Sequence, residues 1–302
     1  MPDNIIECVP NFSEGRDQAL IADLAAIVTK HRHVKLIDIH TDPDHNRSVF
    51  TILGTVEEVE AVAFRLIQKA SQRINLERHC GTHPRIGAAD VVPFVPLVNV
   101  TMQDCVAMAR RLAKRVGEAL EIPAFVYGQA ALLAEHLDLS TIRNGNYEKL
   151  KERIGTDTTH TPDFGPSVLG PAGATVIGAR DFLLAFNIFL DSDDIRIAKL
   201  IAKIIRESSG GLKAVKALGM IVDGKAQVST NLTNFRETSL RTVFEAIKAE
   251  AATMGVAPVR SELVGCLPEA AIEGIEPKSI LLRDFSPVKI LETHLSEIFQ
   301  PR

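Results

Sequence analysis

The chain has 302 residues, enough for about two domains of roughly 100 to 200 residues each. Hydrophobic residues make up 46% and charged residues 24%, with 34 basic against 38 acidic side chains and a net charge of −4. This composition is typical of a soluble globular protein. It excludes a disordered chain, a fibrous chain and a protein that coats nucleic acid.

No apolar run approaches the roughly 18 to 20 residues that a membrane helix needs, and residues 1–4 lack the basic and then apolar pattern of a secretion signal. We therefore expect a cytoplasmic protein with no membrane partner and no nucleic-acid partner. The four cysteines show no paired spacing, so we expect reduced, mostly buried thiols at Cys8, Cys80, Cys105 and Cys266.

The first part of the chain predicts the order β-α-β-β-α-β. The expected elements are a strand at 5–9, a helix at 20–28, strands at 34–39 and 48–53, a helix at 55–74 and a strand at 90–98. Thr55 followed by Glu58 is a capping-box signature for the second helix. Pro93 and Pro96 indicate that the last strand lies at an edge of its sheet.

The second part of the chain repeats this order. The expected elements are a strand at 182–190, a helix at 195–205, strands at 218–222 and 226–232, a helix at 240–254 and a strand at 259–263. Asp223-Gly224 is a tight-hairpin signal between the two middle strands. The sequence therefore predicts an α+β protein with two ferredoxin-like (βαββαβ) α/β sandwich subdomains, residues 1–179 and 180–302.

Additional segments lie outside the repeated units. We expect a capped helix at 101–120, a strand at 124–127, a Gly/Pro-rich stretch at 161–173 and a helical pattern at 290–298.

In a β-α-β-β-α-β unit three loops emerge at the same end, and in the first unit these loops span residues 10–16, 40–47 and 75–89. They carry four histidines with charged neighbours: His40, His45, His79, His83, Asp42, Asp44, Glu14, Arg16, Arg47 and Arg85. Titratable groups on loops of a rigid scaffold are common in catalytic sites. The alternative is a solvated rim, since exposed charges on loops are ordinary.

A metal site is the first chemistry to weigh in these loops, because His79 and His83 have the His-x-x-x-His spacing of two ligands on one helix face. Gly81 and Pro84 interrupt such a helix, and no Glu follows His79 as in the zinc-protease pattern. We expect no metal, and a metal-dependent amidohydrolase that uses the four histidines stays as the alternative.

Six motifs in order resemble the glutamate formiminotransferase family. They are ECVPNFSEG (7–15), HPRIGAAD with VVPFVP (83–96), PDFGP (162–166), GATVIGAR (173–180), AFN (185–187) and AQVSTNL (226–232). The resemblance implies two α/β subdomains with a substrate cleft or tunnel between them, usually in a homodimer. It also implies transfer of the formimino group of N-formimino-L-glutamate to N5 of tetrahydrofolate in histidine degradation. Vertebrate relatives continue into a cyclodeaminase domain, so a separate cyclodeaminase is one candidate partner.

By the same resemblance His83 is the catalytic acid/base. The family's folate-binding stretch corresponds to Gly165, Pro166, Ser167, Val168, Leu169, Gly170, Pro171, Ala172 and Gly173. Two positions depart from the family pattern: Thr82 stands where relatives often have Glu, and His40 replaces the second member of an Asp-x-Asp pair. The carboxylates that could assist the histidine are Asp42, Asp44 and Asp90.

This chemistry needs a group that takes a proton from N5 and returns one to the leaving amine, and an imidazole with a pKa near 6.5 suits both steps. Arg47 and Arg85 are expected to bind the substrate's carboxylates through their planar forks, the alternative being that either pairs with a neighbouring Asp to order its loop. The remaining expected substrate-binding residues are Asn46, Asp90, Gln227 and Asn231. Formylglutamate or 5-formyltetrahydrofolate as donor, and a non-catalytic folate-binding module, stay as further alternatives.

Overall fold

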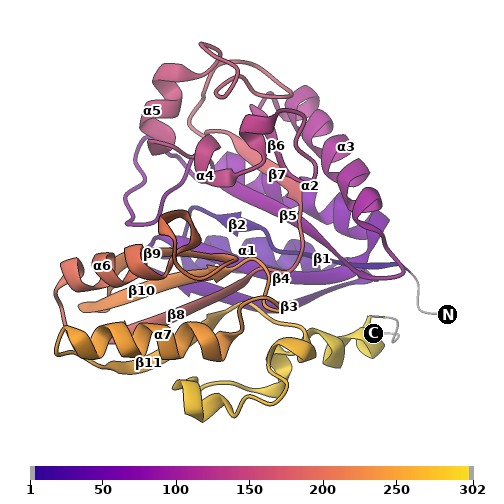
Figure 1. Ribbon diagram of the computed structural model, residues 1–302. Coiled ribbons are helices and arrows are strands. Elements are labelled where there is room, and N and C mark those ends of the chain that lie inside the picture. Colours follow the sequence, from indigo (N-terminus) through magenta and orange to yellow (C-terminus); the bar gives the residue numbers. More distant parts are fainter. Residues whose placement is uncertain (1–3, 299–302) are drawn as a thin grey trace. The chain divides into compact units, whose positions relative to one another are not determined.

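The computed structural model describes residues 4–298. Within this range the chain divides into two compact units (Figure 1). Unit 1 comprises the residues up to Arg180 together with Glu297 and Ile298, and unit 2 comprises Asp181–Ser296. Each unit has its own β-sheet and its own apolar core, so the architecture is α+β with two sheets. No helix in residues 4–298 is long and apolar enough to cross a membrane.

Unit 1 contains a seven-stranded sheet. Its strands are β1 (Ile5–Cys8), β2 (Asn11–Phe12), β3 (Val34–Asp42), β4 (Arg47–Thr55), β5 (Ala89–Val98), β6 (Ala124–Gly128) and β7 (Thr175–Ala179). The strand order is β3, β4, then β1 and β2 in line, then β5, β7 and β6. The pairs β5–β7 and β6–β7 are parallel, and the other pairs are antiparallel.

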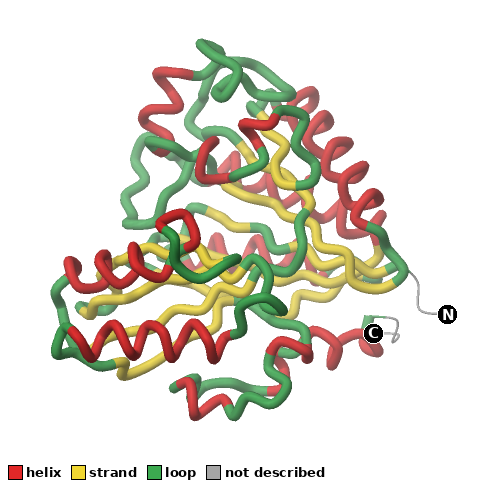
Figure 2. The backbone as a smooth tube through the Cα atoms, in the orientation of Figure 1, coloured by secondary structure: helices red, strands yellow, loops and turns green. Residues whose placement is uncertain are grey.

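Three long helices pack on this sheet and bury apolar stripes: α1 (Gln18–Thr29), α2 (Val56–Arg73) and α3 (Met102–Leu120). Thr55 is the N-cap of α2, but its side chain makes no capping hydrogen bond, so the predicted capping box is absent there. A capping box does form at α3, where Thr101 and Asp104 bond each other's backbone N–H groups. Between β6 and β7 the chain runs mostly through loops and two short helices, α4 (Leu139–Ile142) and α5 (Asn146–Arg153) (Figure 2).

The prediction that β5 is an edge strand is wrong. It lies inside the sheet, between β1 and β2 on one side and β7 on the other. Pro93 lies opposite the break between β1 and β2, where its carbonyl accepts from Val9 N at 3.2 Å, and Pro96 lies beside the register shift at Ile5 and Ile6. Proline has no backbone N–H to donate to a neighbouring strand. Because the pairing is irregular at these two positions, no such donor is needed there, and the interior strand tolerates both prolines.

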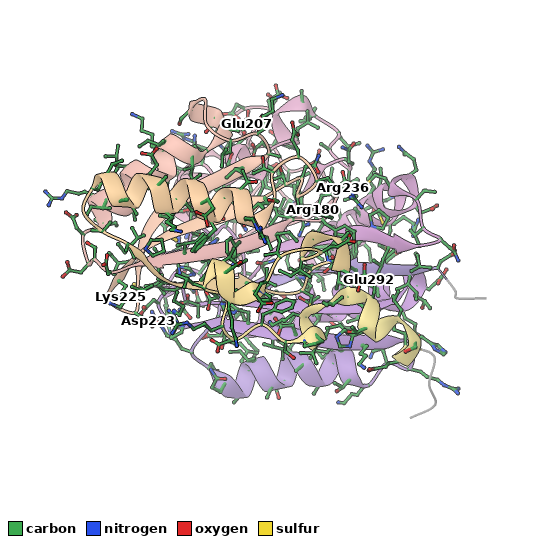
Figure 3. All side chains as sticks on the ribbon, turned by 60° about the horizontal axis from the view of Figure 1, so that its bottom comes forward. Arg180, Glu207, Asp223, Lys225, Arg236 and Glu292 are labelled. Atoms are coloured by element: carbon green, nitrogen blue, oxygen red, sulfur yellow. The ribbon has the colours of Figure 1, made fainter. Side chains whose placement is uncertain are left out.

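Unit 2 follows the predicted order β-α-β-β-α-β. Its elements are β8 (Leu184–Leu190), α6 (Ile195–Ile205), β9 (Val215–Val222), β10 (Lys225–Leu232), α7 (Leu240–Thr253) and β11 (Pro258–Val264). The strand order is β11-β8-β10-β9, and every pair is antiparallel. Asp223 and Gly224 both have positive φ, 52° and 68°, as the predicted tight turn requires, and Figure 3 labels this hairpin tip at Asp223 and Lys225.

The expected helical pattern at 290–298 takes a tighter form. Leu291–Glu297 is a 3-10 helix, and Pro287–Lys289 before it is another. Ile290, between these two turns, forms a parallel β-bridge with Leu267, which donates to Lys289 O at 2.9 Å and accepts from Leu291 N at 3.0 Å. This bridge separates the two 3-10 helices. Among the cysteines, Cys8, Cys105 and Cys266 are buried thiols and Cys80 is exposed.

Candidate active site

The three polar loops of unit 1 do converge, and Asn46 joins them. Its side-chain oxygen accepts from Gly15 N at 2.9 Å in the first loop, and its amide nitrogen donates to Cys80 O at 3.1 Å in the third loop. The second and third loops also meet where Thr82 N donates to Asp44 O at 3.1 Å. Asn46 adopts a left-handed backbone conformation, φ 49°, which asparagine tolerates better than most residues. Its amide therefore holds the loops together.

His83 lies in the loop between α2 and β5 and is partly exposed. Its Nδ1 is 2.8 Å from the Pro84 carbonyl oxygen, which can only accept a hydrogen bond, and 3.2 Å from Arg47 Nη1, which can only donate one. The carbonyl contact is the shorter one, and Arg47 Nη1 has an acceptor in Asp90, so we assign the proton to Nδ1. Burial, followed by the positive charges of Arg47 and Arg143, holds the pKa of His83 well below its usual value. The ring is therefore neutral at pH 7, and Nε2 carries the lone pair that a general base needs.

Asp90 lies at the start of β5, has 0% exposure and forms a hydrogen bond through each oxygen. Oδ1 accepts from Ile86 N at 2.8 Å, which fixes the loop that carries His83. Oδ2 accepts from Arg47 Nη1 at 3.1 Å and also from Arg143 Nη2. The carboxylate thus orders two arginines and a loop.

Arg85 is buried and paired within the protein. Its guanidinium makes a bidentate contact with Glu148 on α5, at 3.0 and 2.7 Å, and its Nε donates to His79 Nδ1 at 3.0 Å. The hydrogen bond from Arg85 lowers the pKa of Glu148. These contacts agree with the alternative in which Arg85 orders its loop, and less well with an arginine that is free to bind substrate. The partner is Glu148, however, and not a neighbouring Asp.

Asp42 contacts a second histidine, His45, which lies against His83. Asp42 accepts from His45 N at 2.8 Å, and its other oxygen lies 3.2 Å from His45 Nδ1. The His45 ring packs edge-on against His83 with a centroid separation of 5.5 Å. His40 lies on β3, opposite Val49 in the ladder with β4.

The loop that carries His83 is hydrogen-bonded to the end of the 165–173 stretch. Ala88 N donates to Ala172 O at 2.8 Å, and Ala174 N donates to Ile86 O at 2.9 Å. Between them, Gly87 and Gly173 form a β-bridge so close that a Cβ on Gly87 would lie 1.8 Å from Ala174 O. Only glycine permits this approach. The two segments predicted to hold the acid/base and the folate are therefore adjacent.

The other end of the 165–173 stretch is fixed to the body of unit 1. Gly165, with φ 83°, packs against Gly117 of α3, and Phe164 and Ala124 exchange backbone hydrogen bonds at 2.9 and 3.1 Å. The middle of the stretch is open: Val168 is 71% exposed. The segment is held at both ends and leaves its centre accessible to a ligand.

In unit 2, Gln227 lies on β10 and has 0% exposure, yet neither atom of its amide has a hydrogen-bond partner among residues 4–298. It alternates along β10 with Ala226 and Val228, which face the core under the helices, so Gln227 and the partly buried Asn231 share the opposite face. A buried amide without partners is costly, and ligand atoms or water on that face would satisfy it.

No three His, Cys, Asp or Glu side chains within residues 4–298 are placed to share a metal ion.

Comparison with known proteins identifies the chain's relatives. The model of the formiminotransferase domain's N-terminal subdomain matches residues 5–180, and that of the formiminotransferase domain matches residues 185–276. The chain belongs to the formiminotransferase family. A glutamate formimidoyltransferase of Thermoplasma acidophilum is 45% identical over 97% of this chain and 98% of its own length. A second, from Streptococcus pyogenes, is 43% identical over 96% and 98%. The formimidoyltransferase-cyclodeaminase of Sus scrofa is 43% identical over 89% of this chain, which covers 51% of that longer protein.

Sequence reasoning missed Arg143 and Glu148. Both lie in residues 139–153, which come before the PDFGP motif and carried no recognised motif, and only the fold brings them to Asp90 and Arg85.

Proposed function

We propose that this protein is a glutamate formimidoyltransferase, which moves the formimino group of N-formimino-L-glutamate to N5 of tetrahydrofolate in histidine degradation. Membership of the formiminotransferase family over nearly the whole chain supports this activity. The observation that carries the site is the backbone pairing of the His83 loop with the end of the 165–173 stretch. This pairing brings the candidate acid/base next to the candidate folate segment.

His83 is the acid/base in this proposal. N5 of tetrahydrofolate attacks the amidine carbon of the donor, and His83 Nε2 takes the proton that N5 loses as the tetrahedral adduct forms. The imidazolium then returns a proton to the glutamate nitrogen, the carbon–nitrogen bond breaks, and L-glutamate leaves. The neutral ring with its proton on Nδ1 is the correct starting state for these steps.

The depressed pKa of His83 sets the direction of the pH dependence. Because burial and the two arginines disfavour the imidazolium, the ring stays deprotonated at pH values where an ordinary histidine is charged. The acid limb of kcat/KM is therefore expected below about pH 6.5.

The remaining parts of the proposal concern architecture and partners. The β-α-β-β-α-β order of unit 2 supports a ferredoxin-like arrangement. We propose subdomains at 1–179 and 180–302 with a substrate cleft or tunnel between them. Folate is a co-substrate, held along residues 165–173 and by Gln227 and Asn231, while Asn46, Arg47 and Asp90 shape the donor side. A homodimer, a cyclodeaminase partner and a reaction without metal stay predictions.

The proposed activity is tested by incubating the protein with tetrahydrofolate and formiminoglutamate, and in parallel with formylglutamate, and following the folate product by absorbance. His83→Ala is expected to bind folate and remain folded while transfer falls by about 10² to 10⁴. The control is His31→Ala. His31 follows α1 and contacts Glu58 on α2, so it is not part of the candidate site. Near-normal turnover of His83→Ala would exclude the assignment. Loss of activity with a chelator would favour the metal-dependent amidohydrolase.

A further inference from the structure

The cluster around Asp90 carries more positive than negative charge. One buried carboxylate, with 0% exposure, faces two guanidinium groups whose side chains are only 13% and 12% exposed, those of Arg47 and Arg143. Burial, followed by repulsion from Arg143, lowers the pKa of Arg47 to about 10, so Arg47 is still charged at pH 7. With His83 neutral, the cluster has a surplus of one positive charge.

Among the described residues, Asp90 is the carboxylate that forms ion pairs with both arginines. Asp90 is the acidic group that acts on Arg47, and Arg47, Arg143 and His45 are the charged or titratable groups that act on His83. The nearby carboxylates have other partners. Glu148 pairs with Arg85, and Asp42 accepts from backbone N–H groups and lies against His45.

The two arginines differ in what they have left to donate. Arg47 donates Nη1 to Asp90 and Nη2 to Asn11 Oδ1, and its Nη1 also lies 3.2 Å from His83 Nδ1. Arg143, which directly follows α4, donates Nη2 to Asp90 and makes no other side-chain hydrogen bond within residues 4–298. Its Nε is buried, so Nη1 is the donor that remains for a ligand. An arginine with spare donors, next to a neutral histidine and in a site with surplus positive charge, is suited to bind a carboxylate.

We propose that Arg143 binds the α-carboxylate of the donor amino acid. This inference rests on the proposed function. In formiminoglutamate, only the amino nitrogen and Cα separate the transferred carbon from the α-carboxylate. The γ-carboxylate is two methylenes farther away, and the glutamate tail of folate lies beyond the aminobenzoyl ring. When the transferred carbon is beside His83, the α-carboxylate is therefore the anion closest to the Asp90 cluster.

The test uses binding of the product L-glutamate, measured by calorimetry, so that it does not depend on turnover. Its analogues are 4-aminobutyrate, which lacks the α-carboxylate, and 2-aminobutyrate, which lacks the γ-carboxylate. The variants are Arg143→Met, which removes the charge, and Arg143→Lys, which keeps the charge without the planar fork. The matched control is Arg153→Met, because Arg153 is an exposed arginine at the end of α5. Circular dichroism establishes that each variant is folded.

We expect Arg143→Met to weaken L-glutamate binding by about 10- to 100-fold, Arg143→Lys to be intermediate, and Arg153→Met to bind like the wild type. The wild type should prefer L-glutamate to 4-aminobutyrate, and Arg143→Met should largely lose this preference while keeping its preference over 2-aminobutyrate. In turnover, the KM for formiminoglutamate should rise more than the KM for tetrahydrofolate.

Unchanged glutamate affinity in folded Arg143→Met would overturn the inference, as would a wild type that binds no glutamate. Loss of preference over 2-aminobutyrate alone would also overturn it, since that result assigns Arg143 to the γ-carboxylate. A selective rise in the KM for tetrahydrofolate polyglutamates would assign it to the folate tail. A protein that binds glutamate through Arg143 but does not transfer the formimino group would support the inference and refute the proposed function.

Discussion

Asp90→Asn is the substitution whose cost the charge arrangement predicts most directly. The amide can still accept from Ile86 N, but Arg47 and Arg143 then face each other without a counter-charge. Two unit charges about 4 Å apart interact by roughly 4 kcal/mol at an effective dielectric constant of 20. Breaking a buried ion pair by removing one partner costs about 3–5 kcal/mol. We expect a loss of that size in the free energy of unfolding of unit 1.

A double-mutant cycle with Arg143→Met separates the effect of charge from that of packing. In the wild-type background, Arg143→Met leaves Asp90 paired with Arg47 and should cost about 1–2 kcal/mol. In the Asp90→Asn background, Arg143→Met removes one of two positive charges that have no counter-charge. There it should leave the free energy of unfolding unchanged or increase it. The resulting coupling energy is expected to reach about 2 kcal/mol.

Tyrosine fluorescence during urea unfolding measures these effects in the right unit. The chain has no tryptophan and only two tyrosines, Tyr127 and Tyr147, and both belong to unit 1. The control is Glu118→Gln, which breaks the exposed pair with Lys114 on α3 of unit 1 and should change the free energy of unfolding by less than about 0.5 kcal/mol. Additive costs of Asp90→Asn and Arg143→Met would refute the charge argument.

Two further predictions concern the segments that flank the site. Both ring nitrogens of buried His136 lie within hydrogen-bond distance of acceptors, Asp163 Oδ2 and Thr159 O. Burial by itself lowers the pKa of His136, but the hydrogen bond and the charge of Asp163 outweigh burial and raise this pKa. His136→Gln should therefore lower the free energy of unfolding by about 1–3 kcal/mol below pH 6.5. This loss should shrink as the pH rises through the raised pKa of His136. A loss of stability in thermal melts that does not change with pH would contradict this prediction. Gly87→Ala should cost about 1–3 kcal/mol in urea unfolding, because its Cβ would meet Ala174 O at 1.8 Å. Gly170→Ala, with no atom within 4 Å of its Cβ, should be near neutral, and equal costs would refute the close-approach argument.

Local pattern was sufficient to predict most helices and strands, because each long element has an apolar stripe or run of its own. It failed where a distant segment decides the outcome. Pro93 reads locally as an edge signal, yet the break between β1 and β2 allows it inside the sheet. Thr55 reads as a capping residue, but its side chain makes no capping hydrogen bond at α2.

The same distinction applies to the site. The convergence of the three loops follows from the chain reversals of a β-α-β-β-α-β unit, and Asn46 shows it directly. The electrostatic environment could not be read in this way. Arg143 is 53 residues from Asp90, and Glu148 is 63 residues from Arg85, in a segment whose helices have four and eight residues. No periodicity or motif in that segment points to a carboxylate elsewhere in the chain.

These distant contacts also explain why a glycine-containing loop can hold an acid/base in place. The loop around His83 has little regular structure of its own, so its conformation depends on hydrogen bonds to other segments. Ile86 N donates to the Asp90 carboxylate, and Ile86 O accepts from Ala174 N. A positioned imidazole needs such support, because a small displacement of a reacting group is costly in rate. Substitutions in residues 139–153 or 170–174 that remove one of the hydrogen bonds to this loop or to Asp90, without touching a reacting atom, should therefore reduce turnover through the position of His83.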